Sequence, residues 1–120
     1  MTTQQIKGII VPILTPMNED ESINHEELVR QIERLIDAGV HGIFVFGTNG
    51  EGYILSEEEK AAVLKTTVDP VHGRVPVYAG TGCISTRDPI RQSLKAQELG
   101  ADALSIITPS FAAASQDALI

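Results

Sequence analysis

The sequence predicts an α/β fold with a parallel sheet, and three observations support this class. Short β-rich runs alternate with helical stretches along the chain, in the order βαβαβαβ. The strand-like runs are continuous in Ile, Val, Phe and Leu, which is typical of parallel strands covered on both faces. A weak internal repeat aligns residues 37–43 with residues 98–104, two βα units further on. The spacing of about 30 residues per unit is close to one eighth of a (β/α)₈ barrel.

These patterns place each element in the chain. Strands are expected at 8–11, 42–46, 75–79 and 103–107, helices at 24–38, 57–70 and 87–98, and the start of a fourth helix at 115–120. Doubly wound open sheets show the same alternation, so the pattern alone does not choose between them and a barrel. No Gly-x-Gly-x-x-Gly follows the first strand, where the chain runs Pro12-Ile13-Leu14-Thr15-Pro16, and this argues against a dinucleotide-binding fold.

Two helix starts carry capping signals. Asn24 with Glu27, and Ser56 with Glu59, have the spacing of a capping box. Each such cap contributes ~1 kcal/mol to helix stability. Gly39 stands just after the first helix, where a left-handed residue is favoured.

Periodicity also predicts which helix faces are buried. In the third helix Ile90 and Leu94 are expected to face inward. The side chains of this helix expected to face water are those of Arg87, Arg91, Lys95 and Glu98. The inward face expected for the first helix consists of Leu28, Ile32, Leu35 and Ile36.

Composition excludes several classes of protein. The 120 residues are the length of one ordinary domain, and 42% hydrophobic content is enough for a core. The net charge of −7, without a cluster of Lys and Arg, argues against nucleic acid or an anionic membrane as a partner. Cys83 is the only cysteine, so no intramolecular disulfide is possible and a reducing compartment is favoured. With no secretory signal and no apolar run of ~20 residues, we expect a soluble cytoplasmic protein.

In a βα barrel the functional groups follow the C-terminal ends of the strands. The candidates at these positions are Thr15 and Pro16, Thr48, Asn49 and Glu51, Gly80 to Cys83, and Thr108, Ser110 and Phe111. The loop Gly47-Thr48-Asn49-Gly50-Glu51 is the most informative of these. Its glycines expose backbone N–H groups, while Thr48 and Asn49 add a hydroxyl and a carboxamide, a set that can hold a carboxylate. A tight turn without a ligand remains the alternative for these five residues alone.

The other polar residues give no second site. His25 falls at a helix start, His41 at the N-terminal end of a strand, and His72 in a loop at the opposite edge. Because the three do not converge, no metal centre is expected. Cys83 has no base nearby in the chain and is interpreted as an inert thiol.

The lysines matter because amine catalysis needs a lysine that projects into a desolvated site. The chain has four, at 7, 60, 65 and 95. Lys7 precedes the first strand and the others lie on expected outer helices, so none is placed to form a Schiff base.

Several motifs in one order resemble the dihydrodipicolinate synthase and N-acetylneuraminate lyase family. The first motif is residues 10–16, and the second is residues 47–51 together with 55–59. The third is residues 79–82 together with 85–87, and the last two are residues 100–104 and 108–109. The resemblance implies a (β/α)₈ TIM barrel and a class I aldolase that binds pyruvate or a related 2-oxo acid as a lysine imine, without a cofactor. It also implies a homo-oligomer, a dimer or a tetramer. By this similarity Thr48 is a catalytic residue in a hydroxyl relay that contacts the substrate, and Asn49 binds the substrate carboxylate.

The chain departs from the family pattern at a few positions. Asn49 stands where the synthases usually have Thr, and it is more similar to 4-hydroxy-2-oxoglutarate aldolases. Ser110 and Phe111 stand where the family often has two tyrosines of the relay. Gly52, Ile84 and Ser110 replace residues that bind feedback lysine in some synthases.

The resemblance assigns residues 1–120 to the N-terminal part of a single barrel domain, with the family's catalytic lysine beyond residue 120. We therefore expect a truncated chain that is inactive alone and whose parent is a lyase. A synthase that joins pyruvate to an aldehyde, an aldolase that cleaves a hydroxy-oxo acid and a sugar-acid dehydratase share this first half. A noncatalytic half-barrel module is the alternative from a different class.

Overall fold

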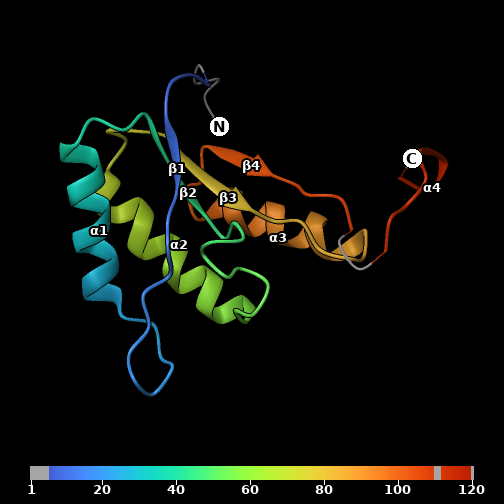
Figure 1. The fold of residues 1–120 in the computed structure, drawn as a ribbon, viewed down its shortest axis with the longest axis horizontal. Coiled ribbons are helices and arrows are strands. Elements are labelled where there is room, and N and C mark those ends of the chain that lie inside the picture. Colours follow the sequence, from blue (N-terminus) through green and yellow to red (C-terminus); the bar gives the residue numbers. More distant parts are fainter. Residues whose placement is uncertain (1–5, 110–111, 120) are drawn as a thin grey trace.

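The computed structural model describes residues 6–109 and 112–119, and it confirms the expected alternation of strands and helices (Figure 1). Ser110 and Phe111, two of the candidate residues, lie outside the described residues. The elements are β1 (Ile10–Pro12), α1 (His25–Asp37), β2 (Gly42–Val45), α2 (Glu57–Val71), β3 (Val77–Gly80), α3 (Arg87–Glu98), β4 (Ala103–Ser105) and α4 (Gln116–Leu119).

The four strands form one parallel sheet in the order β1-β2-β3-β4. Val11 on β1 is paired with Ile43 on β2, and Ala79 on β3 is paired with Leu104 on β4. A doubly wound sheet changes direction at a switch point, whereas these strands keep the order of the chain. The strand order therefore decides between the two folds that the alternation left open, in favour of a barrel segment.

The core lies between the sheet and the helices. α2 packs between α1 and α3, and the three helices cover the sheet (Figure 1). Alternate residues of β2 and β3 meet the apolar faces of α1 and α2, and these side chains are almost fully buried: Ile43, Val45, Val77, Ala79, Leu28, Ile32, Val63 and Leu64. The predicted inward face of α1 is confirmed, since Leu35 and Ile36 also pack against this core.

The two predicted capping boxes differ in outcome. At α2 the box is complete, because Ser56 Oγ accepts from Glu59 N and the Glu59 carboxylate accepts from Ser56 N. At α1 only half of it forms: Asn24 Oδ1 accepts from Glu27 N at 2.9 Å. The second half of that prediction is wrong, because Asn24 N–H donates instead to the carbonyl of Pro16 at 2.8 Å. Asn24 thus caps the helix and also anchors the chain after β1.

The prediction that Ile90 and Leu94 face inward is wrong. Their side chains are 58% and 59% exposed on α3. The buried residue of this helix is Ala96, and the side of α3 that faces α2 carries Gln92, followed by Leu99 at the C-cap. α3 therefore has two apolar stripes, and the described residues cover only one of them. The charged residues of α3 do face solvent as predicted: Arg87, Arg91, Lys95 and Glu98.

Gly39 has φ +85°, which confirms the left-handed residue expected after α1. Among the described helices, none is both long enough and apolar enough to cross a membrane.

Candidate functional site

The loops that follow the strands form a continuous edge of the molecule, because neighbouring loops touch in turn. Thr15 after β1 donates a hydrogen bond to the carbonyl of Gly50 in the loop after β2. A Cβ placed on Gly80, at the end of β3, would lie 2.6 Å from Phe46 O, which precedes that loop. A Cβ on Gly82 would lie 2.7 Å from Ile107 N, which follows β4. The structure thus brings together the strand-end loops in which the sequence placed its candidates.

The loop after β2 begins with a backbone turn at Phe46. Phe46 has φ +65°, a conformation that costs a non-glycine residue on the order of 1–3 kcal/mol. The backbones of Gly52 and Gly80 both pack closely against its carbonyl oxygen, since a Cβ on either glycine would lie 2.6 Å from Phe46 O. Glycine is required at both positions for this approach. The turn at Phe46 directs the following residues, 47–51, across the end of the sheet.

Thr48 and Asn49 both lie at the exposed surface of this loop. Neither side chain is hydrogen-bonded to any other described residue. The backbone of the turn is closed by Glu51 N–H, which donates to Thr48 O at 3.1 Å. The hydroxyl and the carboxamide are thus available to a ligand, and the carboxamide N–H₂ can donate to a carboxylate. Their assigned roles in binding and catalysis remain predictions.

The histidines lie where the sequence placed them. His25 starts α1 and its ring contacts Thr66 Oγ1 at 2.8 Å, while His41 Nδ1 accepts from Ile9 N at 3.0 Å. His72 ends α2 in a left-handed conformation. Within the described part of the chain, no group of His, Cys, Asp and Glu side chains could hold a metal ion.

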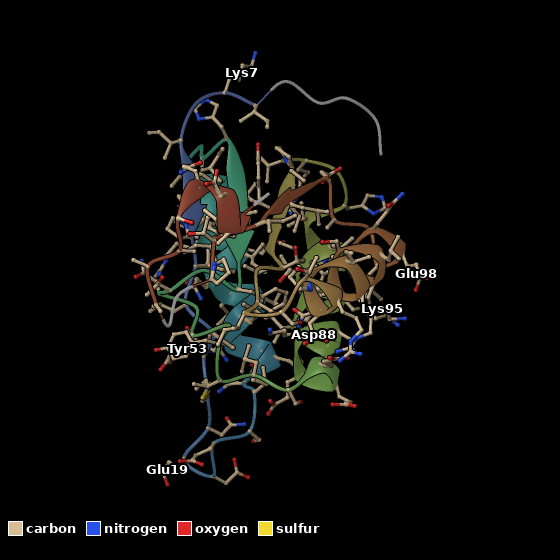
Figure 2. The ribbon with its side chains drawn as sticks, turned by 90° about the vertical axis from the view of Figure 1, so that its right-hand side faces the viewer. Lys7, Glu19, Tyr53, Asp88, Lys95 and Glu98 are labelled. Carbon is tan, nitrogen blue, oxygen red and sulfur yellow. The ribbon has the colours of Figure 1, made fainter. Side chains whose placement is uncertain are left out.

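The lysines also lie where the sequence placed them, before β1 or on the helices. Figure 2 shows Lys7 at the top of the molecule, Tyr53, which follows the loop, in its lower half, and Lys95 on the outer surface of α3. Lys60 Nζ donates to Gln92 Oε1 at 3.3 Å, and Lys65 is exposed on α2. None of these four lysines lies on a strand or in the loop that carries Thr48.

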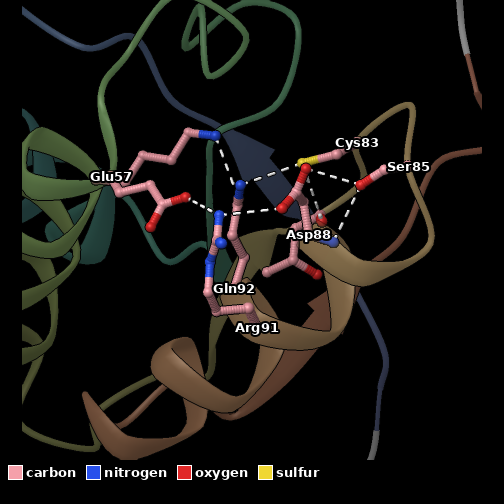
Figure 3. A network of polar contacts seen from close by, with 8 residues as sticks. Glu57, Cys83, Ser85, Asp88, Arg91 and Gln92 are labelled. Atoms are coloured by element: carbon pink, nitrogen blue, oxygen red, sulfur yellow. Dashed lines mark hydrogen bonds and ion pairs between the residues drawn. The ribbon is translucent and has the colours of Figure 1, made fainter.

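A polar network joins α2, α3 and the loop before α3 (Figure 3). Gln92 Nε2 donates to the half-buried Cys83 Sγ at 3.1 Å. Arg91 forms ion pairs with Glu57 and, at 3.1 Å, with Asp88. Sequence reasoning missed Gln92, because a glutamine in mid-helix gives no local signal of a partner on another element.

Beside this network lies a cavity of about 350 Å³ between α2 and α3. Its walls include Phe46, Lys60 and Gln92 but neither Thr48 nor Asn49. This cavity therefore lies between two helices and reaches the end of β3 at Gly80, whereas Thr48 and Asn49 lie outside its walls.

The consecutive parallel strand order, the helices that cover the sheet and the joined loops at the strand ends define the class of this chain. It is a segment of a (β/α)₈ barrel. Residues 5–120 match the model of the dihydrodipicolinate synthetase family, and the chain belongs to this family.

Curated relatives and solved structures agree with this assignment. The 4-hydroxy-tetrahydrodipicolinate synthase of Methanopyrus kandleri is 41% identical over 116 residues, which are 96% of this chain and 39% of the relative. The synthase of Staphylococcus carnosus is 42% identical over 95% of this chain and 38% of its own length. The chloride-inhibited dihydrodipicolinate synthase of Acinetobacter baumannii complexed with pyruvate superposes with a TM-score of 0.92 and 38% identity, over 96% of this chain and 40% of that one. YagE of E. coli K12, also in complex with pyruvate, gives a TM-score of 0.90 at 36% identity, over 97% of this chain and 39% of its own.

The chain thus spans about two fifths of the length of the relatives and structures it matches. This part of the chain shares the fold of the corresponding part of these proteins, and the activity of the parent protein is the subject of the proposal below.

Proposed function

We propose that the parent protein carrying this segment is a lyase that binds pyruvate, or a related 2-oxo acid, as a lysine imine. The main support for this proposal is the loop after β2, which exposes Thr48 and Asn49 at the strand ends of a barrel of the dihydrodipicolinate synthetase family. Two structural neighbours that share this fold hold pyruvate. In this proposal Asn49 donates hydrogen bonds to the substrate carboxylate, and the Thr48 hydroxyl carries a proton to or from the reacting centre.

The imine forms when a lysine amine adds to the ketone carbon of the 2-oxo acid and water leaves. We propose that this lysine lies in the part of the parent barrel outside residues 1–120. Lys7 lies before β1, and Lys60, Lys65 and Lys95 lie on the helices rather than on a strand. The isolated 120-residue chain would accordingly be inactive. Neither a metal nor an organic cofactor is needed for this chemistry.

The parent is proposed to be a cytoplasmic homo-oligomer and a single barrel domain of which residues 1–120 form the N-terminal part. A reducing compartment is favoured by the single Cys83. The dimer or tetramer is proposed from the family resemblance.

The reaction itself has two leading candidates. The curated relatives are named as synthases, which favours condensation of pyruvate with an aldehyde. Asn49, which resembles the 4-hydroxy-2-oxoglutarate aldolases, favours cleavage of a hydroxy-oxo acid. Assaying the intact protein in both directions separates them: consumption of pyruvate only when an aldehyde is added supports the synthase, and release of pyruvate from 4-hydroxy-2-oxoglutarate supports the aldolase.

Trapping tests the shared step. The intact protein is incubated with pyruvate and then with borohydride, which reduces the C=N bond to a stable amine. The proposal expects one adduct per subunit in the mass spectrum, absent when either reagent is omitted. An intact parent that forms no adduct with pyruvate or any other 2-oxo acid would contradict the proposal.

A further inference from the structure

The loop that carries Thr48 and Asn49 is held only weakly by its own backbone. Its internal hydrogen bonds are Glu51 N–H to Thr48 O at 3.1 Å and Gly52 N–H to Gly47 O at 3.4 Å. The first bond has an ordinary length, and the second is longer than the usual range for N–H···O hydrogen bonds. A carboxylate-binding loop needs a fixed geometry, because a misplaced donor loses most of its value. The support for this loop must therefore come from outside it.

Thr15 supplies that support. Its Oγ1 donates to the carbonyl of Gly50 at 2.7 Å across a separation of 35 residues, and the bond is buried. Gly50 itself packs closely against the residue that follows β1, since a Cβ on Gly50 would lie 2.8 Å from Ile13 O. The hydrogen bond thus acts on the residue next to Asn49, at the point where the loop rests on the first strand.

Thr15 is in turn held on both sides by α1. The backbone of Leu14 is bound twice by Gln31, whose Oε1 accepts from Leu14 N and whose Nε2 donates to Leu14 O, each at 3.1 Å. The carbonyl of Pro16 accepts from Asn24 N at 2.8 Å. The residues before and after Thr15 are therefore fixed to one helix, so that the hydroxyl of Thr15 is presented in one position.

We infer that Thr15 is a positioning residue that sets the loop of Thr48 and Asn49 for a 2-oxo-acid carboxylate, an inference that rests on the proposed function. Thr15 acts through Gly50 and does not touch the substrate. The chain of contacts runs from α1 through Leu14 and Thr15 to Gly50 and then to Asn49.

A merely structural threonine is available in the same chain for comparison. Thr67 is fully buried on α2, and its Oγ1 donates to the carbonyl of Val63 at 2.9 Å. Thr15 and Thr67 thus both bury a hydroxyl that donates to a backbone carbonyl. Only Thr15 makes this bond to the substrate loop.

The test uses the intact parent protein, with pyruvate as the probe. Thr15→Val keeps the shape of the side chain but leaves the carbonyl of Gly50 without its donor. We expect the KM for pyruvate to rise about three- to tenfold, the effect of one lost hydrogen bond, while kcat changes less than about twofold. Hydrogen exchange at the amides of Glu51 and Gly52 should become faster. Thr15→Ser, which keeps the donor, should recover most of the affinity.

Thr67→Val is the matched control, because it deletes a buried hydroxyl whose hydrogen bond lies within α2. It should lower Tm without changing the KM for pyruvate or the exchange at Glu51 and Gly52. If Thr15→Val does not fold, Gln31→Met loosens the same support from α1 and should raise the KM in the same direction by a smaller factor.

The inference is overturned if the KM of Thr15→Val for pyruvate is unchanged, or that of Gln31→Met where this variant has to replace it. It is also overturned if Thr67→Val raises the KM to the same extent. A wild-type protein that forms no imine with any 2-oxo acid overturns the proposed function and this inference with it. The two failures are distinguishable, because only the second is seen in the wild type.

Discussion

At the scale of the residue, Asn49 is the side chain whose proposed role is easiest to isolate. It is exposed and has no hydrogen bond to another described residue, so its loss should cost little stability. A hydrogen bond to a charged carboxylate is worth about 1.5–3 kcal/mol, so Asn49→Ala should raise the KM of the intact protein for pyruvate at least about tenfold. Steady-state kinetics with pyruvate measures this directly.

The control for Asn49→Ala is Asn18→Ala, a change of the same kind in another exposed loop. Asn18 Nδ2 donates only to the side chain of Ser22 at 2.9 Å among the described residues. Figure 2 shows the adjacent Glu19 at the tip of that loop. Equal pyruvate KM values for Asn49→Ala and the wild type would contradict the role given to Asn49.

The candidate residues themselves could be predicted from the sequence, but their supports could not. Thr48 and Asn49 stand between glycines directly after a strand, a local pattern that is visible in the chain. The contact between Thr15 and Gly50 joins residues 35 apart and exists only once the strands are paired. The left-handed Phe46 carries no local signal, because phenylalanine rarely adopts positive φ.

At the scale of the element, an ion pair ties α1 to the turn after α2. Arg74 contacts Glu33 with two bonds, Nη2 to Oε1 at 2.6 Å and Nη1 to Oε2 at 3.0 Å. The hydrogen bond from Arg74 holds the pKa of Glu33 below its ordinary value of 4.5. The stabilising effect is therefore complete above pH 4.5 and is lost as the pH falls through the lowered pKa of the folded state.

Glu33→Gln should lower Tm at pH 7, and the difference from the wild type should shrink as the pH falls below 4.5. Thermal unfolding of the intact protein across pH 3–7 measures this difference. Glu19 lies in an exposed loop and forms no ion pair with another described residue, so Glu19→Gln removes the same charge and should show no such trend. A Tm difference for Glu33→Gln that grows on acidification would contradict the assignment.

The elements show where sequence patterns are sufficient and where they fail. Alternation and capping residues predicted the helices and the strands, because these signals are local. The buried face of α3 was predicted wrongly: Ile90 and Leu94 have helical spacing, but the residue of this helix that packs into the core is Ala96. Periodicity finds an apolar stripe without saying which neighbour covers it.

At the scale of the whole molecule, the described fold leaves apolar surface and strand edges open. β1 and β4 each have one neighbour in the sheet. Ile90, Leu94, Ile106 and Ile107 are 58–64% exposed. Open edges and exposed apolar side chains promote association. The isolated 120-residue chain should therefore elute in size-exclusion chromatography as polydisperse aggregates, well above its 12.9 kDa mass.

Replacing Ile90 and Leu94 by Glu should reduce that association, whereas replacing the exposed Gln97 by Glu, on the same helix, should not. Light scattering on the eluted peak gives the mass of the species. A monodisperse dimer with protected amides would contradict this expectation and would support the noncatalytic half-barrel module.

The most direct measurement of the central claim is an intact mass of the protein from its natural source, before and after pyruvate with borohydride, followed by peptide mapping. The account predicts a mass near that of a complete barrel of ~250 residues and one reduced adduct on a lysine outside residues 1–120. A 12.9 kDa species without an adduct, or an adduct on Lys7, Lys60, Lys65 or Lys95, would contradict it.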